Sequence, residues 1–113
     1  MARVRWSAAA RQQFDALLGW HQQFRSPEQA ARIAADIRQT IRRAAARPTL
    51  YPWVGSVHVD LSDLPHSFRR VLTRQSQHTI YYRYDAADGW INILQIQGRG
   101  QLPPSAKDLV TTP

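Results

Sequence analysis

The chain contains no cysteine, and only one methionine, one lysine and one glutamate, among its 113 residues. Without cysteine, neither a disulfide framework nor a thiolate metal site is possible, and we expect a protein of the reducing cytoplasm. The first six residues carry two arginines and no apolar run behind them, so we expect neither a signal peptide nor a membrane span there. We also expect no metal and no cofactor. The four histidines form no pair at helical ligand spacing, and no phosphate-binding glycine loop or nucleophile motif is present.

The charge of the chain is strongly one-sided. Fifteen Lys and Arg residues face eight Asp and Glu, which gives a formal charge of +7 and a pI near 11. All of the basic residues except Lys107 are arginine, the side chain that binds carboxylate and phosphate in a bidentate way. The charge therefore favours an acidic partner, which on this basis alone can be a nucleic acid or an acidic protein. The length and the 43% of apolar residues predict one domain with a single core.

The first half of the chain predicts two helices. Ser7 has the residue type and position of an N-cap, and apolar residues recur at helical spacing over 8–24. Ser26 caps the second helix, Pro27 fits its first position, and a continuous apolar stripe runs until the helix ends before Pro48. Because only two or three residues join them, the two helices should lie antiparallel.

Residues 48–65 predict a long connection, since they include three prolines and Gly55. A loop of this length in a small domain is often functional. The alternative is structural: Leu50, Tyr51 and Trp53 pin the loop to the core.

The last third of the chain changes to strand patterns. Residues 68–74, 78–84 and 90–97 predict an antiparallel meander, and residues 3–6 predict a further short strand. The fold class is therefore α+β, in the order β-α-α-β-β-β, with an antiparallel sheet packed on a helical hairpin. We expect a single domain over residues 1–104 and a flexible C-terminal tail over residues 105–113.

The order and residues of these elements resemble the RelE/ParE superfamily of toxins, and look closest to its ParE, or plasmid-stabilisation, branch. One part of the resemblance is the alanine-rich second helix that ends at Arg47-Pro48. The strands over 68–74 and 78–84 resemble the family's "R-x-L … H-x-I-x-Y-R" pair of strands, and the strand over 90–97 with Gly98-Arg99 resembles its last strand and terminal basic turn. The segments that carry the resemblance are Val4-Arg5-Trp6-Ser7-Ala8, Phe68-Arg69-Arg70-Val71, His78-Thr79-Ile80-Tyr81-Tyr82-Arg83-Tyr84 and Ile91-Asn92-Ile93-Leu94-Gln95-Ile96 with Gly98-Arg99.

The resemblance implies a small bacterial cytoplasmic toxin of a type II toxin–antitoxin system that inhibits growth. A cognate antitoxin would neutralise it: an acidic, DNA-binding partner whose tail folds on the toxin, in a heterotetramer or a larger complex. ParE-like members act against DNA gyrase, whereas RelE-like members cut messenger RNA on the ribosome. The chain departs from both patterns, with Thr79 where RelE-like members carry an arginine and Gln97 where ParE-like members often carry a histidine.

RNA cleavage needs a base, an acid and cations that stabilise the phosphorane. Arginine can supply only the cation, and Glu28 lies in the first turn of a helix, where it stabilises the helix dipole. His78 is the one candidate of suitable pKa in the meander. A nuclease site would therefore consist of Arg69, Arg70, His78 and Arg99.

The chain offers few proton carriers beside its arginines, so binding of DNA gyrase is our main prediction. A ribosome-dependent mRNA endoribonuclease and an inactive, toxin-like interaction module remain alternatives. Aromatic and arginine side chains contribute most of the energy of protein interfaces. The predicted residues for contacts with the target or the antitoxin are Trp53, Arg69, Arg70, Arg74, Tyr82 and Arg99.

Overall fold

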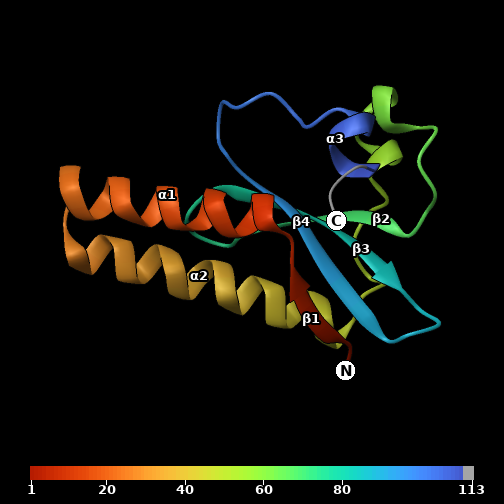
Figure 1. The fold of residues 1–113 in the computed structure, drawn as a ribbon, viewed down its shortest axis with the longest axis horizontal. Helices are drawn as coiled ribbons and strands as arrows, with labels where there is room; N and C mark the ends of the chain where they lie inside the picture. The colour runs from red at the N-terminus through yellow and green to blue at the C-terminus, as the bar shows by residue number, and fades with distance from the viewer. Residues whose placement is uncertain (111–113) are drawn as a thin grey trace.

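Two long helices form an antiparallel hairpin that packs on one face of a four-stranded sheet (Figure 1). The computed structural model describes residues 1–110. Helix α1 spans Ala8–Phe24 and α2 spans Pro27–Ala46. Both predicted caps are present, since the Ser7 Oγ accepts a hydrogen bond from the Ala10 amide at 2.9 Å and the Ser26 Oγ accepts one from the Gln29 amide at 3.1 Å. The local sequence therefore determines where each helix begins.

The sheet has the order β1-β4-β3-β2. Strands β2 (Phe68–Leu72), β3 (His78–Asp85) and β4 (Trp90–Gly98) form the predicted antiparallel meander. Strand β1 (Arg3–Trp6) pairs with β4 in parallel, so the α+β class is confirmed but the sheet is mixed rather than antiparallel. A short hairpin turn between two strands makes them antiparallel, but no such turn connects β1 to β4, so the sequence did not determine the direction of β1.

The helical hairpin and the sheet enclose the larger core. Helix α2 contributes the fully buried Ile37, and the sheet contributes Ile80, Tyr82, Ile91 and Ile93, all with no exposed surface. The small alanines on α2, such as Ala44 and Ala45, are also buried and allow the helix to approach the sheet closely. The residues buried between the helices and the sheet are thus those at which the sequence places its periodic apolar positions.

A β-bulge in β4 changes the face on which its side chains lie. Tyr81 pairs with Gln95 and Tyr82 pairs with Ile93, so that Leu94 has no partner in the register. The extra residue keeps Ile93 and Ile96 in the core under the helices, while Leu94 joins a second cluster on the opposite face of the sheet. Both faces of the central strands are therefore buried.

The second cluster is covered by irregular segments rather than by long helices. The two 3-10 turns, Val54–Ser56 and Val59–Leu61, and the short helix α3 (Ala106–Val110) lie over this face (Figure 1). Leu109 of α3 has no exposed surface. The flexible tail predicted for residues 105–113 is therefore wrong for residues 106–110, which fold onto the domain, while residues 111–113 lie outside the described part.

Within residues 1–110, no helix combines the length and the apolarity that crossing a membrane requires.

Candidate functional site

The neighbouring arginines of β2 lie on opposite faces of the sheet. Arg69 pairs with Tyr82, whose side chain is in the core under the helices, and Arg70 pairs with Tyr81, whose side chain is in the second cluster. The Arg69 Nη1 donates to the carbonyl of Tyr51 at 2.7 Å and to that of Thr49 at 3.2 Å. Arg69 therefore holds the 48–53 loop against the sheet, and part of its hydrogen-bonding capacity is used within the fold.

Tyr82 belongs to the core rather than to a binding surface, contrary to the prediction. Its side chain has no exposed area, and its hydroxyl donates to the Pro48 carbonyl at 2.7 Å. Burial raises the pKa of the Tyr82 hydroxyl far above its ordinary value, so the group stays protonated and remains a donor. The alternation of β3 places Tyr82 on the face that the helices cover, which the aromatic composition of this strand did not reveal.

Trp53 fixes the path of the long connection. Its Nε1 donates to the Leu64 carbonyl at 2.9 Å, and its ring lies 4.3 Å from the His66 ring between centroids. A side chain at Gly55 would clash with the indole, because a Cβ there would lie 2.4 Å from a ring carbon. The alternative that the loop is pinned to the core thus holds for Tyr51 and Trp53, which pack against the first and the second cluster. It does not hold for Leu50, which is 60% exposed.

His78 begins β3 and is held by the β2–β3 turn. Its amide donates to the Thr73 Oγ1 at 2.9 Å, and its Nδ1 lies 2.9 Å from the Ser76 Oγ. The Ser76 hydroxyl donates to the Thr73 Oγ1 at 3.1 Å, so the Nδ1 of a neutral His78 carries the proton that meets the Ser76 Oγ. This arrangement leaves the Nε2 of His78 as an acceptor.

Asp36 of α2 anchors the same turn. Its Oδ2 accepts from the Ser76 amide at 2.7 Å and from the Gln75 amide at 3.1 Å. Although burial opposes it, these bonds from the turn hold the pKa of the Asp36 carboxyl below its usual value. Burial, followed by the charge of nearby His21, lowers the pKa of the His78 imidazole.

Two surface hollows meet at His78. One, of about 320 Å³, lies between α1, α2 and the β2–β3 turn, and includes His21 and Arg32. The other, of about 430 Å³, lies between α1 and the end of β4, and includes Gln13 and Arg99. The structure therefore brings His78 and Arg99 together. Arg69 and Arg70 pair with residues three or four positions beyond His78 on β3, which separates them from it by about 10 Å or more along the strand.

Arg74 and Arg99 are the predicted arginines that are most open to a partner. Both are exposed, and the Arg99 Nη1 donates to the Gln77 Oε1 at 2.8 Å. His21 of α1, which the sequence did not single out as a site residue, lines one of the hollows together with His78, and its Nδ1 is buried without a hydrogen-bond partner. Its helical position alone gave no sign that it would face the start of β3.

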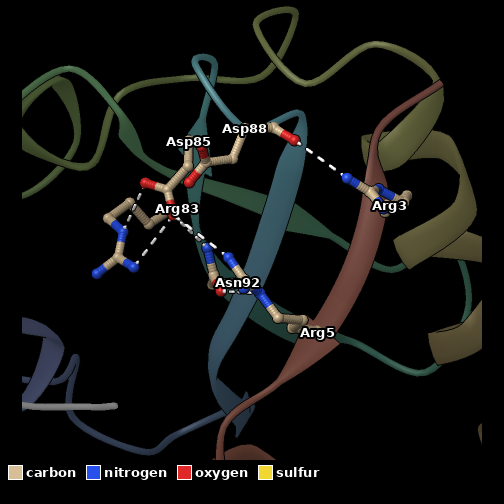
Figure 2. Close-up of polar contacts among 6 residues, drawn as sticks. All are labelled: Arg3, Arg5, Arg83, Asp85, Asp88 and Asn92. Atoms are coloured by element: carbon tan, nitrogen blue, oxygen red, sulfur yellow. Dashed lines mark hydrogen bonds and ion pairs between the residues drawn. The ribbon is translucent and has the colours of Figure 1, made fainter.

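A second polar group lies at the other end of the sheet (Figure 2). Arg5, Arg83, Asp85 and Asn92 come from β1, β3 and β4, and their side chains bond to one another. The sequence analysis missed this group, because the β3–β4 pairing brings Arg83, Asp85 and Asn92 together but Arg5 joins them only through the pairing of β1 with β4. The alternation of Arg3 and Arg5 in the first strand was its one signal.

Among the described residues, no three His, Asp or Glu side chains gather closely enough to hold a metal ion.

Solved structures of similar fold are toxin–antitoxin systems. A chain of the chromosomal ParDE system from P. aeruginosa matches with a TM-score of 0.67 and 18% identity, over 87% of this chain and 96% of that one. A chain of the toxin–antitoxin complex RelBE2 from Mycobacterium tuberculosis matches with a TM-score of 0.51 and 16% identity, over 87% of this chain and 98% of that one. The fold is thus that of the RelE/ParE class, as the sequence predicted. No curated protein shows significant sequence similarity.

The family is defined by the sequence as well. Residues 4–103 match the family of ParE toxins of type II toxin–antitoxin systems. The chain belongs to this family, and is therefore a toxin of a type II toxin–antitoxin system.

Proposed function

We propose that the protein inhibits DNA gyrase by binding to it, in the cytoplasm, and that a cognate antitoxin neutralises this activity. The observation that carries the proposal is that the residues predicted for a nuclease site do not lie together in the structure. Arg69 and Arg70 lie on opposite faces of the sheet, and Arg69 is bound to loop carbonyls, so the predicted set has no common centre. A binding surface needs no such convergence. The match of residues 4–103 to ParE toxins supports the same choice.

The contact surface that we propose is the end of the sheet around the β2–β3 turn and the β4 end. Arg74 and Arg99 are exposed there. Arg99 lines one of the two hollows that meet at His78, and Arg74 directly precedes Gln75, which lines the other. Arginines in such partly enclosed surroundings are common anchors of interfaces. Trp53 is only partly buried and is a secondary candidate, whereas Arg69 and Arg70 lie away from this surface, Arg69 being bound to the carbonyls of the 48–53 loop.

The test is a supercoiling assay with purified gyrase and purified toxin. We expect loss of supercoiling or accumulation of a cleavage complex, weakened about tenfold in an Arg74→Ala/Arg99→Ala double variant. An Arg42→Ala/Arg47→Ala variant loses the same charge elsewhere and should inhibit normally. Undisturbed supercoiling at a high excess of toxin would reject gyrase as the target.

One observation favours the nuclease as a second candidate. The His78 imidazole and the Arg99 guanidinium border the same hollow, so a proton carrier and a cation do lie together. This function predicts cleavage of ribosome-bound message, lost in His78→Gln. Intact transcripts after induction of the toxin would exclude it. Growth that continues normally without antitoxin would instead identify an inactive interaction module.

The proposed antitoxin is acidic and DNA-binding, with a tail that folds on the toxin in a heterotetramer or larger complex. The formal charge of +7 supports an acidic partner through electrostatic steering. Helix α1 of the hairpin also exposes two aromatic side chains, Trp20 at 47% and Phe24 at 59% of their surface. These rings would pack against an amphipathic helix of the antitoxin's tail. Co-expression with the reading frame immediately upstream, followed by size determination of the purified complex, tests this part.

A further inference from the structure

The polar group at the far end of the sheet lines a hollow of about 300 Å³. Its walls include Arg5 from β1, Asn92 from β4 and Arg83 from β3, together with Trp6 and Ser7. Arg5 and Arg83 both pair with Asn92, so the three side chains lie on one face of the sheet. This is the face opposite the helical hairpin, because the alternating neighbours Ile91 and Ile93 lie in the core under the helices.

One carboxylate organises the two guanidinium groups in this hollow (Figure 2). Asp85 accepts from the Arg83 Nε at 3.0 Å and from the Arg83 Nη2 at 3.3 Å, with one carboxylate oxygen for each. It also accepts from the Asn92 Nδ2 at 2.8 Å, while the Asn92 Oδ1 accepts from the Arg5 Nε at 3.0 Å. The Arg5 Nη2 lies 3.8 Å from Asp85. A single negative charge therefore fixes the positions of two positive ones without balancing both.

Trp90 holds the arginines of β1 from the side. The guanidinium carbons of Arg3 and Arg5 each lie 4.4 Å from the centroid of the Trp90 ring. Such a contact orients a guanidinium group and removes part of its hydration. Arg5 is still half exposed, with 48% of its side chain accessible, so a ligand can reach it.

Helix α1 adds a third positive feature at the edge of the same hollow. The helix begins directly after Ser7, which caps it, and its first turn, Ala8-Ala9-Ala10-Arg11, contains no carboxylate. The positive end of a helix of 17 residues thus adjoins the two arginines.

We propose that this hollow binds a backbone phosphate of duplex DNA. The positive groups come from three elements, β1, β3 and the start of α1, and so approach from different directions. This arrangement suits a tetrahedral anion, whose oxygens point several ways. A planar carboxylate uses the planar fork of one arginine, and Asp85 already occupies the fork of Arg83.

The proposal rests on the proposed function in one respect, namely the choice of DNA, which gyrase holds, over RNA. The contact itself needs no gyrase and lies at the other end of the sheet from Arg74 and Arg99. The toxin would therefore touch the enzyme and its DNA through different surfaces. Failure of the DNA contact, with gyrase inhibition intact, leaves the proposed function standing.

The test is a titration of a fluorescein-labelled 20-base-pair DNA duplex with the purified toxin at several salt concentrations. We expect Arg5→Gln to weaken binding about tenfold and to lower the slope of log affinity against log salt by about one. Arg5→Lys keeps the charge but loses the planar fork of the guanidinium group. The affinity of this variant for the duplex should therefore lie between those of the unchanged toxin and Arg5→Gln. Arg47→Gln, which removes the same charge at the exposed end of α2, should change affinity less than twofold, and thermal unfolding verifies that each variant is folded.

Three outcomes would overturn the proposal. The first is an equal effect of Arg5→Gln and Arg47→Gln, which would reveal only a general effect of charge. The second is binding of a polyglutamate peptide as tight as that of the duplex and equally sensitive to Arg5→Gln, which would identify an acidic protein as the ligand. The third is binding of single-stranded RNA of the same length with no binding of the duplex.

Discussion

The two faces of the sheet are both buried, but they are buried in different ways. The face under α1 and α2 packs regular elements against each other, with Ile37 and Ile80 at its centre. The opposite face is covered by two 3-10 turns and a five-residue helix, whose anchor is Leu109. At the β1 end the cover stops, and Arg5, Arg83 and Asn92 line an open hollow. The comparison teaches that packed regular elements fill the face under the helices, while the irregular cover of the opposite face leaves a polar hollow open at the β1 end.

The largest expected effect is on the face under the helices. Ile80→Ala should lower the free energy of unfolding by about 3–4 kcal/mol, because the side chain is fully buried and its neighbours cannot close the cavity. Urea denaturation of the purified protein measures this change. A loss below about 1 kcal/mol would mean that the two faces do not differ as described.

Leu109→Ala probes the opposite face. Its leucine is equally buried, but the five-residue α3 can detach without unfolding the sheet, so we expect a loss of only about 2 kcal/mol. Hydrogen exchange should show faster exchange confined to α3 and the 54–64 turns. An unchanged protein would instead support the flexible tail that the sequence suggested.

The next comparison uses two adjacent tyrosines. Tyr82→Phe removes the buried hydrogen bond to the Pro48 carbonyl and should cost about 1–2 kcal/mol. Tyr81→Phe removes a 3.4 Å contact with the His58 Nε2 and the interaction of the Tyr81 hydroxyl with Arg70, which is only partly buried, and should cost less. Thermal unfolding of both variants gives the difference, and equal losses would contradict the assigned roles.

The smallest effect concerns pH. Burial lowers the pKa of both His78 and His58, one on each face of the sheet, below the ordinary value of 6.5. The unfolded chain then binds more protons than the folded one, so stability is complete above pH 6.5 and falls as the pH drops below it. Because His78 is more buried, His78→Gln should flatten the curve between pH 7 and pH 5 more than His58→Gln does. Asp36 and Asp85 do not interfere, since their lowered carboxyl pKa values shift their contribution to more acidic pH.

Local signals made the first half of the fold predictable from the sequence. Ser7 and Ser26 mark the starts of α1 and α2 because an N-cap depends only on residues a few positions away. Likewise, the predicted end of α2 before Pro48 agrees with its observed end at Ala46. The direction of β1 was not predictable in this way, because its partner lies 87 residues further along the chain.

The candidate sites were less predictable than the fold. Strand alternation predicts that Arg69 and Arg70 point to opposite faces of the sheet. It does not predict that Arg69 donates hydrogen bonds to carbonyls of the 48–53 loop. Helix α3 has five residues, too few for a helical period to be visible after Pro103-Pro104. Tyr82 and Trp53 were assigned to the surface because aromatic composition does not distinguish a core residue from an interface anchor.

The pairing of β1 with β4 also sets the order in which the molecule can be completed. The first strand leaves the ribosome long before its partner, since Arg5 and Asn92 are 87 positions apart. Until β4 is made, the amides of Arg3 and Ser7 lack their acceptors, the carbonyls of Gly89 and Ile93. The helical hairpin can form during synthesis, but the sheet cannot close and the Arg5–Asp85–Arg83 group cannot assemble. A nascent chain thus acquires this surface only after β4 has been translated.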